Sequence, residues 1–461
     1  MKKFKYTFLL LLSLIVTSCN DFTTIAPTSQ ATLETSLRSA SDFELAVNSV
    51  YSALMLRGNY GLNYILTQEM RADNADNCGG PTGLSASLEE IDTFSELPIN
   101  DNIEVVWRDS YVGINRANAI LERIDDANIN GDIKNRIKGE ALFLRSLYYY
   151  HLALTFGNIP LRLESTTSPN ETLSQVSADE VFNQIISDLM QAEDLLPATF
   201  SGEDVGRATS GAAATLLAKV LLFTGDNQGA EQALRRIVNS NVYSLLNDFN
   251  NIWGAENENN AESIFEVQFR SGGTGTGSPY VDMYTPSPAG AGGGNAIQDA
   301  TDNLFNTFED GDLRRDATIF FDDGNMFVKK YEGDTFTELD SDLNFMVFRY
   351  ADVLLMLAEA IGESEEAYNL INQVRVRAGL NPIDGTTTGT FEEKLLRERR
   401  VELAFENHRW YDLLRFGVAK SVMSEFLNLS ESDITLLYPI PQREIDVSNG
   451  NLVQNPEHIN R

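Results

Sequence analysis

The sequence contains few cysteines, few histidines and few basic residues. Its 461 residues include two Cys and three His, and 35 Lys and Arg stand against 67 Asp and Glu, a formal net charge of −32. Three histidines are too few for a histidine-rich metal centre. The negative charge would repel a phosphate backbone, so nucleic acid is excluded as a partner. No apolar run approaches the roughly 20 residues that a helix needs to span a bilayer.

The first twenty residues follow the pattern of an export signal. Three lysines among the first five residues precede the apolar stretch Phe8–Val16, which is too short for a membrane span. The following Thr17-Ser18-Cys19 resembles the bacterial lipoprotein box, in which the cysteine is acylated and becomes the first residue after cleavage. We therefore expect a lipoprotein signal peptide over residues 1–18, lipidation of Cys19 and a spacer over residues 19–40. Attachment through two or more acyl chains would give a stable anchor.

Most of the remaining chain has helical periodicity, with apolar residues three and four positions apart. The predicted helices are 103–124, 133–156, 177–196, 210–223, 228–239, 349–361, 364–378 and 391–416, after a first helix that begins near Ser41. Several are paired through short glycine-containing turns with small residues at the crossings, which is typical of tetratricopeptide hairpins. We predict a mainly α protein of tetratricopeptide-like stacked helical hairpins. Residues 41–240 form its N-terminal helical region.

Residues 241–461 are predicted to combine framework helices with a loop-rich second lobe that contains a few short strands. The segments Ser263–Phe269, Ala317–Phe321 and Met326–Tyr331 have the composition or alternation of strands. The segment Ser271–Gly294 is rich in Gly, Thr, Ser and Pro, which indicates a long loop. Long loops in compact proteins frequently carry function, so this segment is expected to face a ligand.

Several blocks of sequence, in order, resemble the SusD/RagB family of outer-membrane lipoproteins. They are Gly139–Leu161, Arg349–Ala360, Arg397–Arg415, and a tail with Tyr438–Pro441 and Asn451–Pro456. The resemblance implies a non-catalytic, surface-exposed lipoprotein without a cofactor. Such a protein covers a SusC-like TonB-dependent outer-membrane transporter and captures nutrient, usually oligosaccharide, for import. Starch-binding members place tryptophans at the glycan, whereas two of the three tryptophans here, Trp107 and Trp410, lie on predicted framework helices.

Sugar recognition needs aromatic faces together with amides and carboxylates that meet hydroxyl groups in fixed directions. Two loop regions offer this mixture. The candidate ligand-binding residues are Tyr60, Tyr64, Asp73, Asn74 and Asn77 in the first region, and Trp253, Tyr280 and Tyr284 in the second. Because the four tyrosines lie in segments rich in Gly and Asn, we predict that they form an exposed stacking platform.

Other functions are considered from the same residues. The run Asp73–Asn77 offers oxygen ligands for a structural calcium ion but lacks the spacing of an EF-hand. The charged run Arg397–Arg415 is interpreted as an ion-paired framework and not as a catalytic site. A peptide-binding member of the same uptake system is the alternative function. A glycoside hydrolase is a further alternative, although carboxylate pairs such as Asp310 and Asp312 are expected by chance in so acidic a chain.

Overall fold

The computed structural model describes residues 37–78, 80, 85–166, 168, 174–286 and 296–459. The expected signal peptide, Cys19 and most of the spacer lie outside these residues. Within the described ranges, no helix has the length and apolar character needed to cross a membrane.

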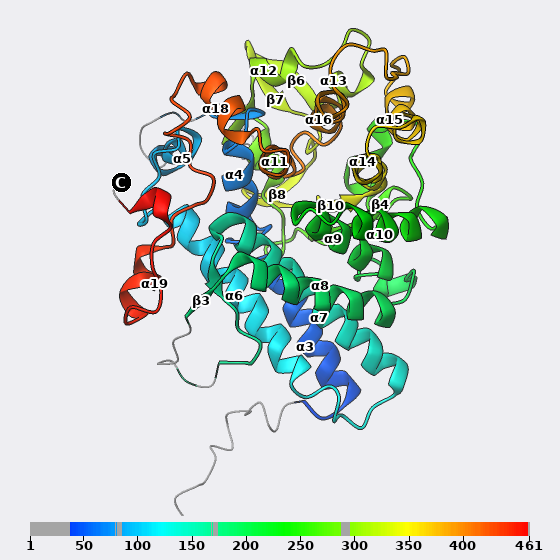
Figure 1. Ribbon diagram of the computed structural model, residues 1–461. Helices are drawn as coiled ribbons and strands as arrows, with labels where there is room; N and C mark the ends of the chain where they lie inside the picture. The colour runs from blue at the N-terminus through cyan, green and yellow to red at the C-terminus, as the bar shows by residue number, and fades with distance from the viewer. Residues whose placement is uncertain are drawn as a thin grey trace, which may run out of the picture.

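The N-terminal region is almost entirely helical (Figure 1). Its helices are α3 (Ala40–Leu54), α4 (Asn63–Met70), α5 (Ala86–Asp92), α6 (Asp101–Leu121), α7 (Gly131–Phe156), α8 (Ala178–Leu195), α9 (Ser210–Phe223) and α10 (Asn227–Ser240). Polar N-caps set several of their starts. The Thr209 side chain accepts from the Ala212 N–H at the start of α9, and Ser39 and Asp42 form a reciprocal capping box on α3.

The C-terminal region mixes helices with short two-stranded sheets. The helices are α11 (Tyr280–Tyr284), α12 (Asp302–Phe305), α13 (Leu313–Thr318), α14 (Tyr350–Ile361), α15 (Glu365–Arg377), α16 (Phe391–Glu402), α17 (Arg409–Arg415), α18 (Ala419–Leu427) and α19 (Gln442–Val447). The strands, which include three from the N-terminal half, are β1 (Ala75–Asn77), β2 (Ile159–Pro160), β3 (Gln175–Val176), β4 (Ser263–Val267), β5 (Gln298–Ala300), β6 (Ile319–Asp322), β7 (Asn325–Val328), β8 (Thr335–Thr337), β9 (Asp340–Ser341) and β10 (Phe345–Arg349). The antiparallel pairs are β1–β5, β2–β3, β4–β10, β6–β7 and β8–β9.

The long helices stack as consecutive hairpins. Helix α6 packs on α7, α7 on α8, α8 on α9 and α9 on α10, and the stack continues from α10 to α14 and α15. The α6–α7 crossing is close: a Cβ at Gly113 would lie 2.3 Å from the Tyr148 ring. The prediction of tetratricopeptide-like stacked hairpins with a few short strands is therefore confirmed.

The predicted helix over 391–416 is interrupted. It forms two helices, α16 and α17, separated by Leu403–His408. Phe405 and Asn407 in this connection have φ values of 63° and 66°, which a right-handed helix cannot contain. The turn is held from outside, because the Asn407 N–H donates to the Glu69 carboxylate and the Tyr331 hydroxyl donates to the Phe405 carbonyl.

A large apolar core runs through both halves of the chain, from Phe43 on α3 to Leu452 beyond α19. A second, smaller cluster consists of Phe249, Ile252, Ala317 and Met346. Polar bonds join the halves as well. Lys219 Nζ on α9 lies 2.6 Å from Asp352 Oδ2 on α14. The Tyr64 and Tyr411 hydroxyls lie 3.1 Å apart.

Candidate functional site

The four tyrosines of the predicted platform lie in the core. Tyr60, Tyr64, Tyr280 and Tyr284 are all buried. Tyr60 Oη lies 3.0 Å from His151 Nε2, and the Tyr280 hydroxyl donates to the Tyr60 carbonyl. The ring of Tyr284 stacks on Tyr331 with centroids 5.0 Å apart.

The prediction of an exposed platform is therefore wrong. The two loop regions do meet, as the Tyr280–Tyr60 bond shows. However, the segment around Tyr280 closes into α11 and inserts its side chains into the core, where their faces are covered by other rings. A ring already packed on both sides cannot stack on a sugar.

We expect a Tyr280→Phe substitution to lower stability and leave ligand affinity unchanged. The variant keeps the ring but leaves the buried Tyr60 carbonyl without this donor, which costs about 1–3 kcal/mol. Urea unfolding measures the loss, and calorimetric titration of the folded variant measures affinity. A selective loss of binding at unchanged stability would restore Tyr280 as a contact residue.

The polar candidates of the first loop region hold the framework together. The Asp73 carboxylate accepts from Arg409 at 2.7 and 2.9 Å, and Arg400 Nε donates to Asn74 Oδ1 at 2.8 Å. Burial acts to raise the pKa of Asp73, but the guanidinium groups of Arg409 and Arg400 outweigh it and hold this pKa below its ordinary value. The Asn77 amide donates to the carbonyls of Gly80 and Ser85 and to Glu89.

These contacts do not favour calcium in the run Asp73–Asn77. Asp73 and Asn74 already accept bonds from guanidinium groups, and the exposed carboxylate of the run is that of Asp76. Among the residues with described positions, no group of three His, Cys, Asp or Glu side chains is arranged to hold a metal ion.

Trp253 is half-buried and lies against a buried cluster of charges. The Lys330 ammonium is 4.5 Å from its ring centroid, within cation–π range, and the Arg349 guanidinium is 5.9 Å away. Phe249 packs against the same ring at 5.7 Å. Trp253 thus covers the cluster with one part of its surface and keeps another part open to solvent.

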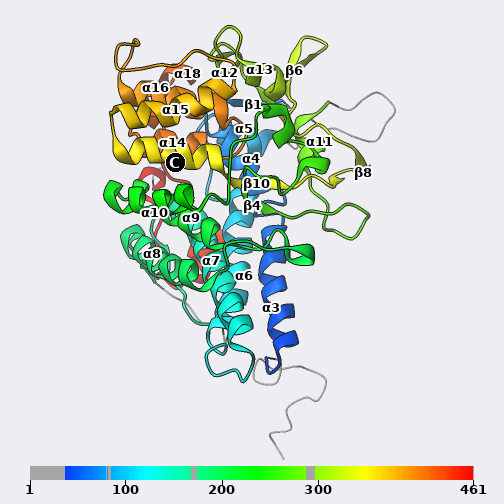
Figure 2. The same ribbon diagram turned by 90° about the vertical axis from the view of Figure 1, so that its right-hand side faces the viewer.

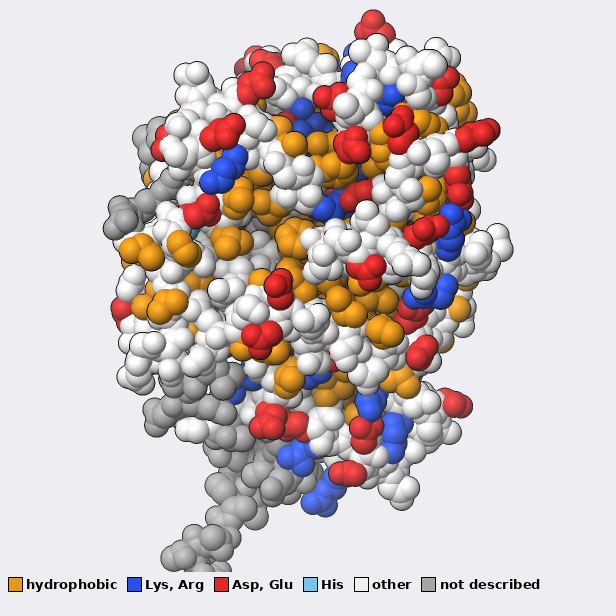
Figure 3. All heavy atoms as spheres, viewed as in Figure 1, with side chains coloured by type: hydrophobic (Ala, Val, Ile, Leu, Met, Phe, Trp, Pro, Cys, Tyr) orange, Lys and Arg blue, Asp and Glu red, His pale blue; other side chains and the backbone are white. Residues whose placement is uncertain are grey.

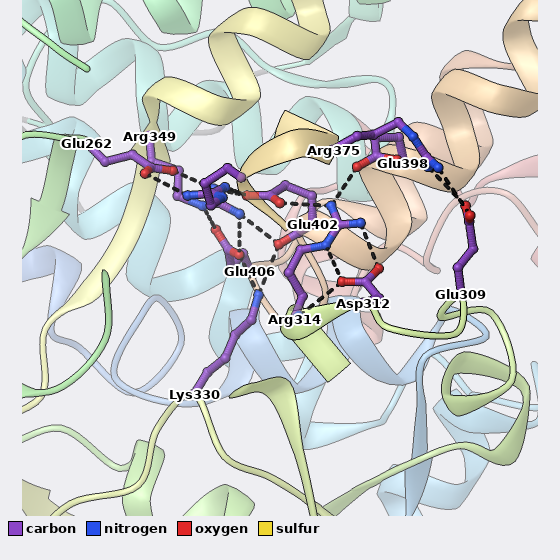
Figure 4. Close-up of polar contacts among 11 residues, drawn as sticks. Glu262, Glu309, Asp312, Arg314, Lys330, Arg349, Arg375, Glu398, Glu402 and Glu406 are labelled. Atoms are coloured by element: carbon purple, nitrogen blue, oxygen red, sulfur yellow. Dashed lines mark hydrogen bonds and ion pairs between the residues drawn. The ribbon is translucent and has the colours of Figure 1, made fainter. Parts of the chain in front are cut away.

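The buried cluster is a continuous network of ion pairs (Figure 4). Arg349 contacts Glu262, Glu402 and Glu406, at 2.8 Å to Glu262 and 2.6 Å to Glu406. Glu402 also pairs with Arg314 at 3.0 Å, and with Arg377. The other members are Glu309, Asp312, Lys330, Arg375 and Glu398.

The framework interpretation of this charged run agrees with these contacts. Glu402 and Glu406 pair with cations that are remote in sequence, whereas Asp412 pairs within the run, with Arg399 at 2.9 Å and with Arg415 at 2.9 Å. Burial would raise the pKa of Glu402, but Arg377, Arg349 and Arg314 together lower it well below its ordinary value. A carboxylate held ionised by three guanidinium groups is a poor proton donor, so Glu402 is unsuited to the general-acid role of a glycosidase.

The surface where the two predicted loop regions meet is different in character. Strand β1 pairs with β5 so that Asp76 lies directly opposite Asp299, and Asp302 follows at the start of α12. Asp76 is exposed but partly desolvated by its surroundings, and this desolvation together with the charges of Asp299 and Asp302 raises its pKa. Like charges directly opposite on paired strands are destabilising. The pairing of β1 with β5 therefore does not by itself explain why Asp76 and Asp299 lie opposite each other.

Two phenylalanines lie next to these carboxylates. Phe305 on α12 and Phe321 on β6 meet edge to face with ring centroids 5.3 Å apart. Phe321 is 59% exposed. Among the side chains that the structure describes, no other Phe, Tyr or Trp is exposed to this extent. We call the surface formed by Asp76, Asp299, Asp302, Phe305 and Phe321 the acidic rim.

The hairpin that presents Phe321 is specified locally. Asp323 and Gly324 connect β6 to β7 with φ values of 46° and 86°, as the two-residue turn with positive φ at both central positions requires. Strand β7 lies beside β5, which brings the hairpin to the carboxylates. Figure 2 shows β1, β6 and α12 grouped at one end of the molecule, opposite the start of α3.

Sequence reasoning missed both phenylalanines of the acidic rim. The segment Ala317–Phe321 was identified as a strand, but its aromatics were not considered as ligand contacts. The available signal was the alternation of strand side chains: of two successive phenylalanines before an Asp-Gly turn, one must face outward.

The fold is that of a helical, tetratricopeptide-like protein, and the acidic rim places an exposed aromatic ring on its surface. A sequence model described as "SusD family" matches residues 324–458, and one described as "Starch-binding associating with outer membrane" matches residues 29–222. The chain belongs to the SusD/RagB family.

Relatives match along nearly the full chain. The "SusD-like protein P2" of Formosa agariphila is 29% identical, with 99% of each chain covered. Among solved structures, surface glycan-binding protein A of Bacteroides fluxus is 28% identical with a TM-score of 0.80, covering 90% of this chain and 99% of its own. A laminarin-binding SusD-like protein gives the same identity and TM-score, with 91% and 99% covered.

Proposed function

We propose that this protein is a non-catalytic, lipid-anchored lipoprotein of the outer-membrane surface. In this proposal it captures oligosaccharide and delivers it to a SusC-like TonB-dependent transporter. Membership of the SusD/RagB family supports the class. The names of two structural relatives, a surface glycan-binding protein and a laminarin-binding protein, support the ligand. The lipoprotein box ending at Cys19 supports the anchor.

The observation that carries the proposal is the exposed ring of Phe321 beside the carboxylates of Asp76, Asp299 and Asp302. An aromatic face stacks on the apolar C–H face of a sugar, and carboxylate oxygens accept bonds from sugar hydroxyl groups. The acidic rim supplies both within one surface. Figure 3 shows a wider face of the molecule on which apolar side chains lie among both acidic and basic side chains.

The test uses the full chain with Cys19→Ala. Calorimetric titration with neutral oligosaccharides should show saturable binding, and incubation with the same ligands should release no new reducing ends. Binding of peptides instead of sugars would support the peptide-uptake alternative. Release of reducing ends would show a glycoside hydrolase and overturn the proposal.

The anchor is tested separately. The native chain should incorporate a radiolabelled fatty acid and fractionate with the outer membrane, whereas the Cys19→Ala variant should do neither. Unchanged membrane fractionation of the variant would contradict lipidation at Cys19.

A further inference from the structure

We propose that a small internal cavity, where the α16–α17 connection meets the N-terminal helices, is a binding site for ordered water. The side chains that bind the water are Asn407 in the connection and His151 on α7. The site is independent of the proposed function, because its lining includes no residue of the acidic rim.

The cavity has a volume of about 30 Å³ and lies where the two halves of the chain meet. Helices α4, α7, α9 and α17, strand β10 and the α16–α17 connection all contribute side chains to its wall. Most of these side chains carry a hydroxyl, imidazole, amide or charged group. A polar cavity holds a water molecule when it offers about 10–15 Å³ and at least two polar partners, so this cavity has room for about two.

Asn407 brings a buried amide to the cavity wall. The residue is only 9% exposed, and neither its Nδ2 nor its Oδ1 has a hydrogen-bond partner among the residues that the structure describes. The backbone at this point is fixed, because the Asn407 N–H donates to the Glu69 carboxylate. Buried side-chain amides are rarely left without partners. The Asn407 amide therefore requires both an acceptor and a donor from a bound molecule.

His151 has the same requirement at one ring atom. Its Nε2 lies 3.0 Å from the Tyr60 hydroxyl, whereas its Nδ1 has no partner within the described part of the chain. The Tyr64 ring stacks on the imidazole with centroids 4.0 Å apart, which fixes the plane of the ring. Burial lowers the pKa of His151 to about 3, so the imidazole is neutral at pH 7. In either neutral tautomer Nδ1 is a donor or an acceptor that needs a partner.

The chemistry of these atoms favours water over an ion. Water both donates and accepts hydrogen bonds, so one kind of molecule satisfies Nδ2 and Oδ1 of Asn407 and Nδ1 of His151. A halide ion can only accept and would leave Oδ1 without a donor, whereas a sodium ion would leave Nδ2 without an acceptor. Lys219, a cation at the cavity wall, already pairs with Asp352 at 2.6 Å and does not require an anion.

The experiment combines a high-resolution crystal structure of the full chain carrying Cys19→Ala with oxygen-17 magnetic relaxation dispersion, which counts slowly exchanging internal waters in solution. In the crystal, a water should lie about 2.7–3.2 Å from the Asn407 amide. Asn407→Gly keeps the left-handed backbone and removes the amide, so it should lower the number of slowly exchanging waters by at least one.

The matched control is Asn428→Gly. Asn428 is also left-handed, with a φ of 53° against 66° for Asn407, but it is exposed and does not line the cavity. This substitution should leave the number of slowly exchanging waters unchanged. The crystal structure of the parent protein tests the site even if Asn407→Gly fails to fold.

Water density at the Asn407 amide, with a loss confined to Asn407→Gly, supports the site. An anomalous signal at the amide in crystals grown with bromide would show a halide and overturn the choice of water. A bond from the amide to a protein group in the crystal, or equal dispersion of the parent and Asn407→Gly, would overturn the site itself. An equal loss in the two glycine variants would also overturn it, because glycine would then act by loosening the fold in general.

Discussion

Replacing Phe321 with alanine should weaken the binding of a neutral oligosaccharide by about ten-fold or more, because truncating a contact aromatic commonly costs at least 1–2 kcal/mol of binding energy. Stability should change by less than about 0.5 kcal/mol, since the ring is 59% exposed and contributes little to the core. Calorimetric titration and urea unfolding of the same preparation measure the two effects separately.

The matched control is Val447→Ala. Val447 lies on α19 and is also 59% exposed, but it is not part of the acidic rim. This substitution should leave both affinity and stability unchanged. A Phe321→Tyr variant should retain most of the affinity, because it keeps the stacking face. Unaltered affinity of Phe321→Ala would remove the rim as the site of capture.

Replacing Glu402 with glutamine should destabilise the protein by roughly 3–5 kcal/mol, the range found when one partner of a buried ion pair is removed. Glutamine nearly preserves the shape, so the loss reports the charge. Without the negative charge of Glu402, Arg314, Arg349 and Arg377 remain buried around a neutral amide. The shift of the urea midpoint gives the change in the free energy of unfolding, provided that the dependence of this free energy on urea concentration is the same in both proteins.

The control for this prediction is an exposed ion pair. Glu366 lies 2.8 Å from Arg235, and both side chains are more than a third exposed. Glu366→Gln should change stability by less than about 1 kcal/mol. A comparable loss in the two variants would contradict the view that burial makes the network critical. Ligand affinity of the folded Glu402→Gln protein should be normal, because Glu402 is buried and its partners Arg314, Arg349 and Arg377 are not residues of the acidic rim.

The helical framework was predictable because its signals are local. Apolar periodicity and polar caps are contained within each segment, and α9 begins and ends at the predicted residues Ser210 and Phe223. Strands β4, β6 and β7 of the second lobe were found by the same reasoning, whereas β5, β8, β9 and β10 were not predicted. Strand β4 begins at Ser263, as predicted.

The connection between α16 and α17 was not predictable from local pattern. The sequence pattern of its residues continues that of the preceding helix. Its left-handed conformations at Phe405 and Asn407 are stabilised by Glu69 and Tyr331, which lie far away in sequence. The prediction of the ligand site was wrong for a related reason. Glycine-rich neighbours suggested exposure for Tyr280 and Tyr284, whereas tertiary contacts decide which rings are covered.

The bonds between the two halves determine when this chain can fold. Arg71 donates to the Thr435 carbonyl, 364 residues later in the sequence, and Lys219 pairs with Asp352, 133 residues later. An emerging N-terminal half would hold both cations without these partners, so it cannot complete its core before the last helices arrive. Contacts of such sequence separation make folding slow. A chain exported from its N-terminus would therefore remain unfolded throughout translocation, and a truncated product would expose buried charge and become a target for proteolysis.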